Sequence, residues 1–298
     1  MKVAIFHNPK AGHGRQKAGE LVRQFEEAGF DVIYASIKGK DWESTLSEPV
    51  DRIVVAGGDG TVSRLAPWLA GRGTPFCILP LGTANNCAMS LGQMNTPETI
   101  ISGLRSERIA QLDLGLVTSS AGHWIFVEAM GGGLLAEFMG EMRSRDKKKN
   151  SKARLSAGER ITNALGHLRR MTKEYSEIEC ELIVDEEVVS GKFLLVEIAN
   201  MGFFGPKLQI LPDVDPKDGL LDVVWVEKDQ RAEWIKQIER YEKGKECHVP
   251  VTSRRCQRVL VRSISGPVHI DGKVFLTMGT PMSIRLQPRA LNLLEFTS

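Results

Sequence analysis

Three loops in the N-terminal part of this 298-residue chain have the composition of phosphate-binding loops. Each follows a short apolar run that is typical of a buried strand. Because glycine has no Cβ and tolerates positive φ, backbone N–H groups in such loops can approach a polyphosphate closely. The loops are residues 8–14 (NPKAGHG), 57–61 (GGDGT) and 81–85 (LGTAN).

The second loop also holds a carboxylate, Asp59, which cannot itself attract phosphate. We expect Asp59 to order the loop, to hold a nucleotide hydroxyl, or to contact Mg²⁺ through water. Thr61 is expected to cap a helix that the spacing of Val62, Leu65 and Ala66 indicates, and the N-terminal end of that helix would also face the anion. The alternative is an ordinary strand-to-helix turn in which Asp59 has no chemical role.

Two common nucleotide-binding signatures are absent from the sequence. Gly12-His13-Gly14 is followed by Lys17 where the G-x-G-x-x-G pattern requires glycine, and G-x-x-x-x-G-K-[ST] occurs nowhere. The chain is therefore neither an ordinary dinucleotide binder nor a P-loop protein.

The elements that must position the three loops alternate between strand and helix. Strands are predicted over residues 2–7, 31–37, 53–56 and 76–79, with helical spacing between them. This alternation predicts a parallel α/β sheet, in which ligands gather at the carboxyl ends of the strands. All three loops lie at such ends.

The pattern changes after about residue 108, where alternating strands predominate. Ile178, Cys180, Leu182 and Val184, for example, alternate with polar residues. A mainly antiparallel, β-rich second domain is therefore expected, with helices near residues 134–142 and 231–241. Its strands are predicted at 108–117, 124–127, 177–184, 192–199, 221–226, 258–262 and 282–286.

The cysteine pattern and hydropathy predict a cytoplasmic protein. The five cysteines, at positions 77, 87, 180, 247 and 256, form no C-x-x-C pair, and we expect reduced, mostly buried thiols. The apolar N-terminal run is too short for a signal peptide, and no run approaches the ~20 residues that cross a bilayer. Any membrane contact is expected to be peripheral. The six histidines show no metal-ligand spacing and are assigned no role.

Positive charge is concentrated in residues 143–173. This segment has eleven Lys or Arg against two acids, a net charge of +9, so the rest of the chain carries −7 of the total of +2. It could dock on anionic lipid, with Ile161, Leu165, Leu168 and Met171 as an apolar stripe. Alternatively, that stripe packs on the protein itself. Nucleic acid is disfavoured, since no aromatic residue is interleaved before Tyr175.

Taken together, these motifs resemble the diacylglycerol kinase catalytic-domain family, which includes ceramide and sphingosine kinases and the soluble bacterial lipid kinases. GGDGT alone also occurs in NAD kinases and is similar to a phosphofructokinase motif. The resemblance implies an α/β nucleotide-binding domain at 1–115, to which residues 289–298 return, and a β-sandwich-like lipid-substrate domain at 116–288. It rests on NPxAGxG at 8–14, GGDGT at 57–61, PLGTAN at 80–85, Asn200, DGL at 218–220 and DG at 271–272.

The resemblance also implies roles for individual residues. Asp271 would be the general base that takes the proton of a lipid hydroxyl, and a Mg²⁺ ion would be held by Asp215, Asp218 and the carbonyl of Leu220. Lys10 and Arg15 could supply positive charge near the phosphates. The nucleotide, ATP, would be bound by Asn8, Ser36, Gly57, Gly58, Asp59, Gly60, Thr61, Val62, Ser63 and Thr83.

Simpler structural interpretations exist for both acidic motifs. Asp271-Gly272 fits a hairpin turn between residues 269–270 and 274–275. The Asp215–Asp218 segment fits a plain Asp/Pro/Gly turn. It is not an EF-hand, because Val224 stands where that loop requires glutamate.

The sequence departs from the family pattern at three positions. Lys273 replaces a glutamate, Glu128 an asparagine, and Leu135 an aspartate. Lys273 could contact phosphate directly, Glu128 could restore the missing carboxylate, or activity could be weak.

The sequence therefore predicts an ATP- and Mg²⁺-dependent lipid kinase, with diacylglycerol as the favoured substrate. Its oligomeric state is left open. The alternatives are a kinase for ceramide, a sphingoid base or another lipid, an NAD-kinase-like enzyme, and a catalytically impaired lipid or nucleotide sensor.

Overall fold

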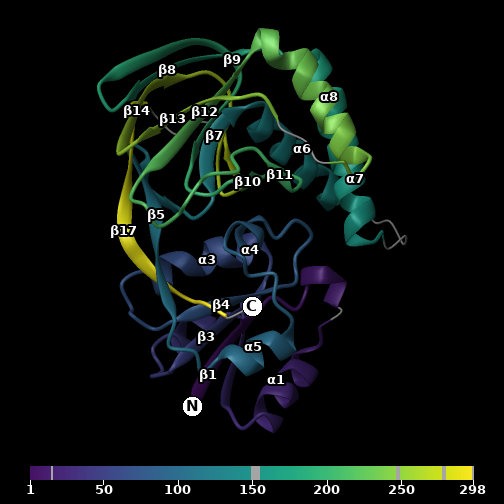
Figure 1. Cartoon of the computed structure of the whole chain (residues 1–298), viewed down its shortest axis with the longest axis vertical. Coiled ribbons are helices and arrows are strands. Elements are labelled where there is room, and N and C mark those ends of the chain that lie inside the picture. The colour runs from purple at the N-terminus through teal and green to yellow at the C-terminus, as the bar shows by residue number, and fades with distance from the viewer. Residues whose placement is uncertain (15, 149–154, 246–248, 277–279, 297–298) are drawn as a thin grey trace. The chain divides into compact units, whose positions relative to one another are not determined.

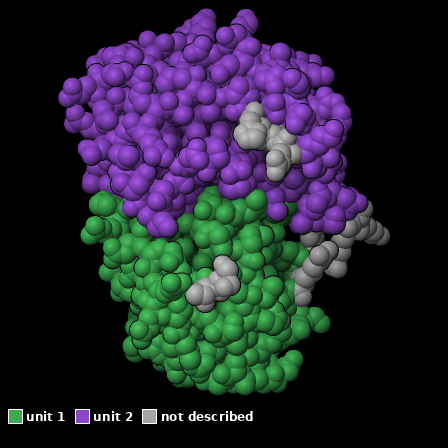
Figure 2. All heavy atoms as spheres, viewed as in Figure 1, with its two compact units in different colours: residues 1–113, 288–298 green, residues 114–287 purple. Residues whose placement is uncertain are grey.

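The computed structural model describes residues 1–14, 16–148, 155–245, 249–276 and 280–296. The chain forms two compact units, residues 1–113 with 288–298 and residues 114–287 (Figure 2). These units are called unit 1 and unit 2 below. The chain passes between them at 113/114 and 287/288, close to the boundaries expected at 115/116 and 288/289.

Unit 1 is built on a parallel sheet with the strand order β4-β3-β1-β2 (Figure 1). The strands are β1 (Lys2–His7), β2 (Asp31–Ser36), β3 (Arg52–Gly57) and β4 (Phe76–Pro80). Every pairing among them is parallel, which confirms the predicted sheet. At the edge next to β4, Leu293 of strand β17 (Met282–Leu294) pairs with Phe76.

Helices cover both faces of this sheet. Helices α1 (Ala18–Glu27) and α5 (Pro97–Gly103) pack on the face that carries Val3, Ile5 and Val54. Helix α3 (Asp59–Leu69) lies on the other face (Figure 1). Sheet residues are buried from both sides, as the continuous apolar runs predict. The short elements are η1 (Ala11–Gly14), α2 (Trp42–Thr45) and α4 (Asn86–Ser90).

Unit 2 is antiparallel, as predicted, with the strand order β16-β15-β7-β9-β8-β14-β17. Strand β12 (Leu221–Glu227) also pairs with β9 and with β13 (Thr252–Cys256). Strands β10 (Phe203–Phe204) and β11 (Leu208–Gln209) form a separate pair. The other strands are β5 (Ile109–Ser119), which begins in unit 1, β6 (Gly122–Phe126), β7 (Ala129–Gly133), β8 (Ile178–Val184), β9 (Glu187–Ala199), β14 (Arg258–Ile264), β15 (Val268–Ile270) and β16 (Lys273–Phe275).

Strand β7 was not expected from its sequence, Ala-Met-Gly-Gly-Gly. Glycine weakens strands unless another group must approach the backbone closely. An added Cβ at Gly131 would lie 2.2 Å from the Glu197 carboxylate, and one at Gly132 would lie 2.6 Å from the Ile264 side chain. The glycines of β7 thus make room for side chains of other strands.

Three helices pack together in unit 2: α6 (Leu134–Lys148), α7 (Ala157–Glu174) and α8 (Arg231–Glu242), the last preceded by the turn η2 (Lys228–Gln230). Helices α7 and α8 run side by side (Figure 1). Ser156 and Glu159 form a capping box at the start of α7. Helix α6 continues beyond the predicted end at 142, so the basic segment begins inside it.

The apolar stripe of the basic segment packs on the protein itself. Leu165 and Leu168 are buried in a core that also contains Trp234. Ile161 and Met171 are partly buried against the same core. The stripe is therefore not an exposed membrane-inserting surface. Residues 149–154, which hold three of the eleven basic residues of the segment, lie outside the described residues, and so does Arg15.

The four cysteines in the described part of the chain are buried and form no disulfide, as predicted: Cys77, Cys87, Cys180 and Cys256. Burial raises the pKa of the Cys180 and Cys256 thiols to about 12. Cys247 lies outside the described residues. No helix among those described is both long and apolar enough to cross a membrane.

Candidate active site

The GGDGT loop joins β3 to α3, and it places the helix start differently from the prediction. Helix α3 begins at Asp59 with Gly58 as its N-cap, so the prediction that Thr61 caps the helix was wrong. Thr61 lies inside the first turn, 2% exposed, and its N–H donates to the Gly58 carbonyl at 2.7 Å. An added Cβ at Gly57 would lie 2.2 Å from Thr61 Oγ1, so glycine at 57 allows this tight start.

The second and third loops are in direct contact. The Leu81 N–H donates to the Gly57 carbonyl at 2.8 Å. An added Cβ at Gly58 would lie 2.8 Å from Gly82 Cα, so the two backbones approach closely only because both residues are glycine. Asn85, at φ +56°, holds the third loop closed by accepting from the Gly82 N–H at 2.8 Å.

Asp59 links the starts of two helices. Its Oδ1 accepts a hydrogen bond of 3.0 Å from the N–H of Cys87, in the first turn of α4. Because Asp59 itself is the first residue of α3, its carboxylate fixes the second loop to the third. The loop-ordering role expected for Asp59 is the one that this contact supports.

The first loop completes the cluster. The Asn8 N–H donates to the Ala56 carbonyl at 2.8 Å, and Asn8 Nδ2 lies 3.5 Å from Thr61 Oγ1. An added Cβ at Gly12, where φ is +55°, would lie 2.9 Å from the Leu81 carbonyl oxygen. The backbone of Lys10 donates to Asn8 Oδ1 at 3.2 Å, and Lys10 is exposed. All three loops thus meet within unit 1.

The remaining predicted nucleotide residues lie at or near the same end of the sheet. Ser36 ends β2 in register with His7 of β1. Ser63 and Thr83 are half-buried. The Val62 side chain is 3% exposed and packs in the core, and its N–H donates to the Gly58 carbonyl. Gly60 is exposed.

In unit 2, Asp271 lies in the tight turn between β15 and β16, which confirms the predicted hairpin. Asp271 and Gly272 have φ of +44° and +70°, the signs that a two-residue type I′ turn requires. Asp271 Oδ2 accepts from the N–H of Val127 at 2.9 Å, and its Oδ1 accepts from those of Glu128 and Ala129 at 2.9 and 3.3 Å. Three backbone donors therefore hold one carboxylate in a fixed orientation.

Asn200 supports this arrangement, and the sequence assigned it no role. The residue is fully buried, and its Nδ2 donates to the Val127 carbonyl at 3.0 Å. Its backbone N–H donates to the Glu128 carbonyl at 2.8 Å. In the sequence, the only signal for Asn200 was its place in the family motif. The three N–H donors of residues 127–129 had no sequence signal, because every non-proline residue has a backbone N–H group.

The Asp215–Leu220 turn is closed by its own carboxylates. Asp215 Oδ1 accepts from the Lys217 N–H at 3.2 Å, and Asp218 Oδ1 accepts from the Leu220 N–H at 2.9 Å. The turn predicted as the simpler interpretation is thus present, and it does not exclude a metal.

An arginine and a buried carboxylate adjoin this turn. Arg255 lies 3.8 Å from Asp218 Oδ2 and 3.5 Å from Asp222 Oδ1. Asp222 is 6% exposed, and its Oδ2 has no hydrogen-bond partner among the described residues. Burial raises the pKa of Asp222, Arg255 opposes this shift, and Asp218 adds to it.

Two family models match the chain. The diacylglycerol kinase catalytic domain matches residues 2–117, and the YegS C-terminal NAD kinase beta sandwich-like domain matches residues 145–295. The chain belongs to the diacylglycerol kinase family. It is a kinase.

Relatives match this kinase along most of their length. A protein named diacylglycerol kinase from Mycobacterium tuberculosis (strain CDC 1551 / Oshkosh) is 26% identical over 99% of this chain and 95% of its own. One named "Probable lipid kinase YegS-like" from Pectobacterium atrosepticum is 28% identical over 74% of this chain and 72% of its own. A crystal structure of a diacylglycerol kinase from Bacillus anthracis str. Sterne has a TM-score of 0.69 at 20% identity, covering 99% of this chain and 97% of that one, which shows the shared fold.

The kinase differs from the family pattern at Lys273, whose ammonium lies against an aromatic ring. Lys273 Nζ is 4.9 Å from the centre of the Phe275 ring, a cation–π geometry on the exposed side of β16. Glu128, the other charged departure, contributes its backbone N–H to Asp271.

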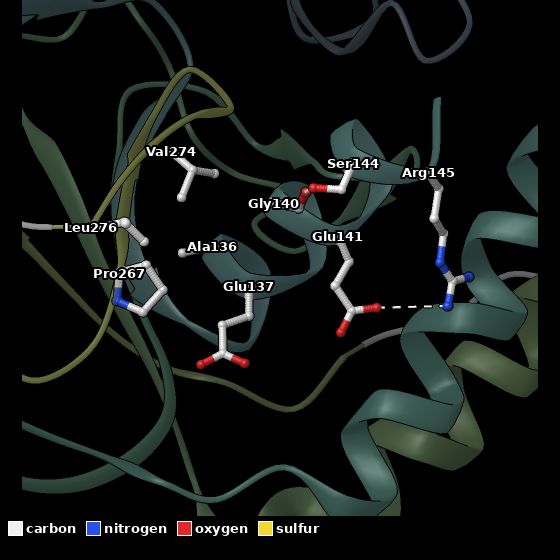
Figure 3. A pocket seen from close by; sticks show the side chains of 9 residues that line it. All are labelled: Ala136, Glu137, Gly140, Glu141, Ser144, Arg145, Pro267, Val274 and Leu276. Atoms are coloured by element: carbon white, nitrogen blue, oxygen red, sulfur yellow. Dashed lines mark hydrogen bonds and ion pairs between the residues drawn. The ribbon is translucent and has the colours of Figure 1, made fainter. Parts of the chain in front are cut away.

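A groove of about 440 Å³ lies between α6 and the hairpin that carries Asp271. Its apolar side chains, Ala136, Pro267, Val274 and Leu276, gather on one side, whereas Glu141 and Arg145 face each other on the opposite side (Figure 3). Glu137, Gly140 and Ser144 also line it. The volume is within the ~300–1,000 Å³ of small-molecule sites.

Helix α6 also touches the Asp271 turn. An added Cβ at Gly272 would lie 3.7 Å from Met139 Sδ, and one at Gly140 would lie 3.9 Å from Val274 Cγ1. The groove and the turn therefore share the same helix–hairpin contact.

Proposed function

We propose that this kinase transfers the γ-phosphate of ATP to a lipid hydroxyl, with diacylglycerol as acceptor and phosphatidic acid as product. The observation that carries the proposal is the meeting of three glycine loops at the carboxyl ends of β1, β3 and β4. Such a cluster of exposed backbone and helix starts suits a triphosphate. The names of the relatives, diacylglycerol kinase and lipid kinase, support the acceptor.

Asp271 is the proposed general base. As the lipid hydroxyl oxygen bonds to the γ-phosphorus, the bond from that phosphorus to the β–γ bridging oxygen breaks, ADP leaves, and the hydroxyl proton passes to the Asp271 carboxylate. A loose transition state requires the proton to be accepted late, so the position of the carboxylate matters more than its basicity. The three N–H donors from residues 127–129 supply that fixed position.

Mg²⁺ would be held by Asp215, Asp218 and the Leu220 carbonyl. The donors are carboxylate and carbonyl oxygens, which this hard cation prefers. Asp222 follows Leu220 by two residues and adds a further carboxylate: its Oδ2 is buried and has no hydrogen-bond partner among the described residues, and its Oδ1 lies 3.5 Å from Arg255. When bound, the ion would stiffen this turn and balance its negative charge.

The groove beside Asp271 is the proposed site for the lipid tail. Its apolar wall of Ala136, Val274 and Leu276 would take hydrocarbon, and Leu276 is 83% exposed. A tail lying there would bring the glycerol end of the lipid to the hairpin that holds Asp271. We further propose a cytoplasmic protein that visits anionic membrane surfaces through the charge of residues 143–173.

The test is incubation of the purified protein with ATP labelled at the γ-position and vesicles of a total lipid extract. Label in phosphatidic acid, lost when diacylglycerol is removed from the extract and restored when it is added back, is the expected result. Label in another lipid would reassign the acceptor. Label only in a water-soluble product would favour the NAD-kinase-like alternative, and ATP binding without any labelled product would favour a sensor.

A further inference from the structure

A buried polar pair spans three strands next to the Asp271 turn. Glu197 of β9 and His269 of β15 both stand in register with Gly131 of β7, the strand between them. Neighbouring strands lie about 4.8 Å apart, so the two side chains must reach across β7 to meet.

Gly131 makes this crossing possible. An added Cβ there would lie 2.2 Å from Glu197 Oε2, so any other residue would collide with the carboxylate. His269 Nε2 lies 3.0 and 2.9 Å from the two oxygens of Glu197. Glu197 is 0% exposed and His269 is 2% exposed. A carboxylate this deeply buried requires a hydrogen-bonding partner, which His269 supplies.

The other nitrogen of the imidazole reaches the turn. The Gly272 N–H donates to His269 Nδ1 at 3.4 Å. Since Nδ1 accepts a hydrogen bond, the ring proton is assigned to Nε2, where it points at Glu197. Contacts therefore run without a break from Glu197 through His269 to the peptide that follows Asp271.

We infer that Glu197 and His269 are positioning residues for Asp271. By holding the Gly272 peptide, the pair fixes the turn so that the Asp271 carboxylate stays on the N–H groups of Val127, Glu128 and Ala129. The effect on catalysis rests on the proposed function, whereas the effect on the turn does not. The pair touches neither substrate in this scheme.

The first test measures backbone hydrogen exchange and needs no kinase activity. His269→Phe keeps an aromatic ring but removes both nitrogens, and it should speed exchange at Val127, Glu128 and Gly272 by at least tenfold while unfolding stays cooperative. Glu197→Gln, made in the protein with His269 intact, keeps an acceptor for Nε2–H and should leave exchange near that of the wild type. His167→Phe is the matched control for exchange, because His167 is also buried and bonded to a glutamate, Glu141 at 2.8 Å. Unchanged exchange in His269→Phe overturns the inference.

The second test is kinetic. A slightly misplaced catalytic group costs on the order of 100-fold, so His269→Phe should lower kcat by roughly 10- to 100-fold without changing KM for ATP. In an Asp271→Asn background, His269→Phe should cause no further loss. An equal further loss in that background would mean a general structural role and would overturn the inference. If the wild-type protein phosphorylates no lipid, the proposed function fails, and the exchange test still decides the positioning role.

Discussion

At the scale of single residues, Asp271 has a close structural counterpart in the same unit. Asp185 also has positive φ, +53°, and it occupies the turn between β8 and β9. Its Oδ1 accepts from the N–H groups of Gln257 and Arg258, both at 3.1 Å. Backbone donors that hold an aspartate in a turn are therefore not unique to the candidate site. Comparing variants of Asp271 and Asp185 can separate a structural effect of the carboxylate from a catalytic one.

Replacing Asp271 by asparagine should abolish most turnover. General bases contribute about 100- to 10,000-fold, so kcat should fall by a factor in that range, measured with labelled ATP and diacylglycerol vesicles. ATP binding, measured by calorimetry, should stay largely intact because the glycine loops lie in unit 1. The control is Asp185→Asn, which makes the same carboxylate-to-amide change in another turn aspartate held by backbone donors and should keep its turnover. Equal losses in both variants would refute the base assignment.

Mg²⁺ should stabilise the protein through Asp218. Without nucleotide, millimolar Mg²⁺ should raise the melting temperature of the wild type, since a ligand that binds only the folded state stabilises it. Asp218→Asn should remove most of that increase, and EDTA should reverse it in the wild type. Asp213→Asn is the control on the same loop, because Asp213 bonds to Arg255 through its backbone carbonyl, and its carboxylate has no hydrogen bond within the described part of the chain. An undiminished shift in Asp218→Asn would argue against this metal site.

His7 should make stability depend on pH. It is 1% exposed, its Nδ1 lies 3.1 Å from the Tyr34 hydroxyl, and burial lowers its pKa below 6.5. As pH falls through 6.5, the unfolded chain takes up a proton that folded His7 resists, so the free energy of unfolding should decrease. His7→Gln should flatten the decrease between about pH 7 and 5, as urea unfolding at several pH values would show. Parallel pH curves for both proteins would contradict this role.

At the scale of elements, the two central glycines of the GGDGT loop serve different purposes. Gly58 faces the backbone of Gly82, whereas an added Cβ at Gly60 would meet nothing within 4 Å. Packing therefore requires glycine at position 58 but not at position 60.

Alanine substitutions should separate these purposes. Gly58→Ala should lower the free energy of unfolding by about 1–3 kcal/mol, the usual cost of overpacking. Gly60→Ala should keep or slightly raise stability, since alanine suits a first helical turn. It should weaken ATP binding, because the added methyl group would hinder the close approach of phosphate to the backbone. Thermal unfolding and calorimetry with a non-hydrolysable ATP analogue measure the two effects. Equal destabilisation by both changes would contradict the assignment.

The sequence predicted those elements whose signal is local. Strands β1, β3 and β4 and their glycine loops were predictable because apolar runs and turn residues lie next to each other along the chain. Strand β7 was not, because its glycines are explained by side chains of Glu197 and Ile264, far away in sequence. The helix start at Asp59 was missed because Thr61 has a side chain that can cap a helix, whereas the actual N-cap, Gly58, has none. Glycine at position 57 leaves room for Thr61 inside the first turn, so the helix begins earlier.

The candidate site was only partly predictable for the same reason. Asp271 and its hairpin follow from a short motif, but its three N–H donors have no sequence signature. The pairing of Glu197 with His269 depends on the register of three strands, which no local pattern encodes. Histidines assigned no role from their spacing can therefore still serve the site.

At the scale of the whole molecule, the proposed membrane docking would depend on charge, because the apolar stripe of α7 is packed inside. Arg143, Arg170 and Lys173 are exposed, and each basic residue near an anionic surface contributes about 1 kcal/mol. Changing all three to glutamine should weaken binding to phosphatidylserine-containing vesicles by roughly 100-fold, about 3 kcal/mol in total.

Vesicle sedimentation at increasing salt tests this prediction. Wild-type binding should fade above ~0.1 M salt, where the Debye length is about 10 Å. The control changes three exposed lysines elsewhere in unit 2, Lys192, Lys228 and Lys236, and removes the same charge. Salt-insensitive binding to neutral vesicles, or equal losses in both triple variants, would contradict the docking role.

The late return of the chain to unit 1 sets an order of maturation during synthesis. Leu293 and Leu294 are 3% and 0% exposed, Leu293 pairs with Phe76, and the Gln93 side chain donates to the Leu294 carbonyl. Unit 2, by contrast, is one continuous stretch, residues 114–287. Unit 1 therefore cannot complete its sheet until the chain has passed through all of unit 2, so the glycine loops are translated first but the sheet that holds them is completed last.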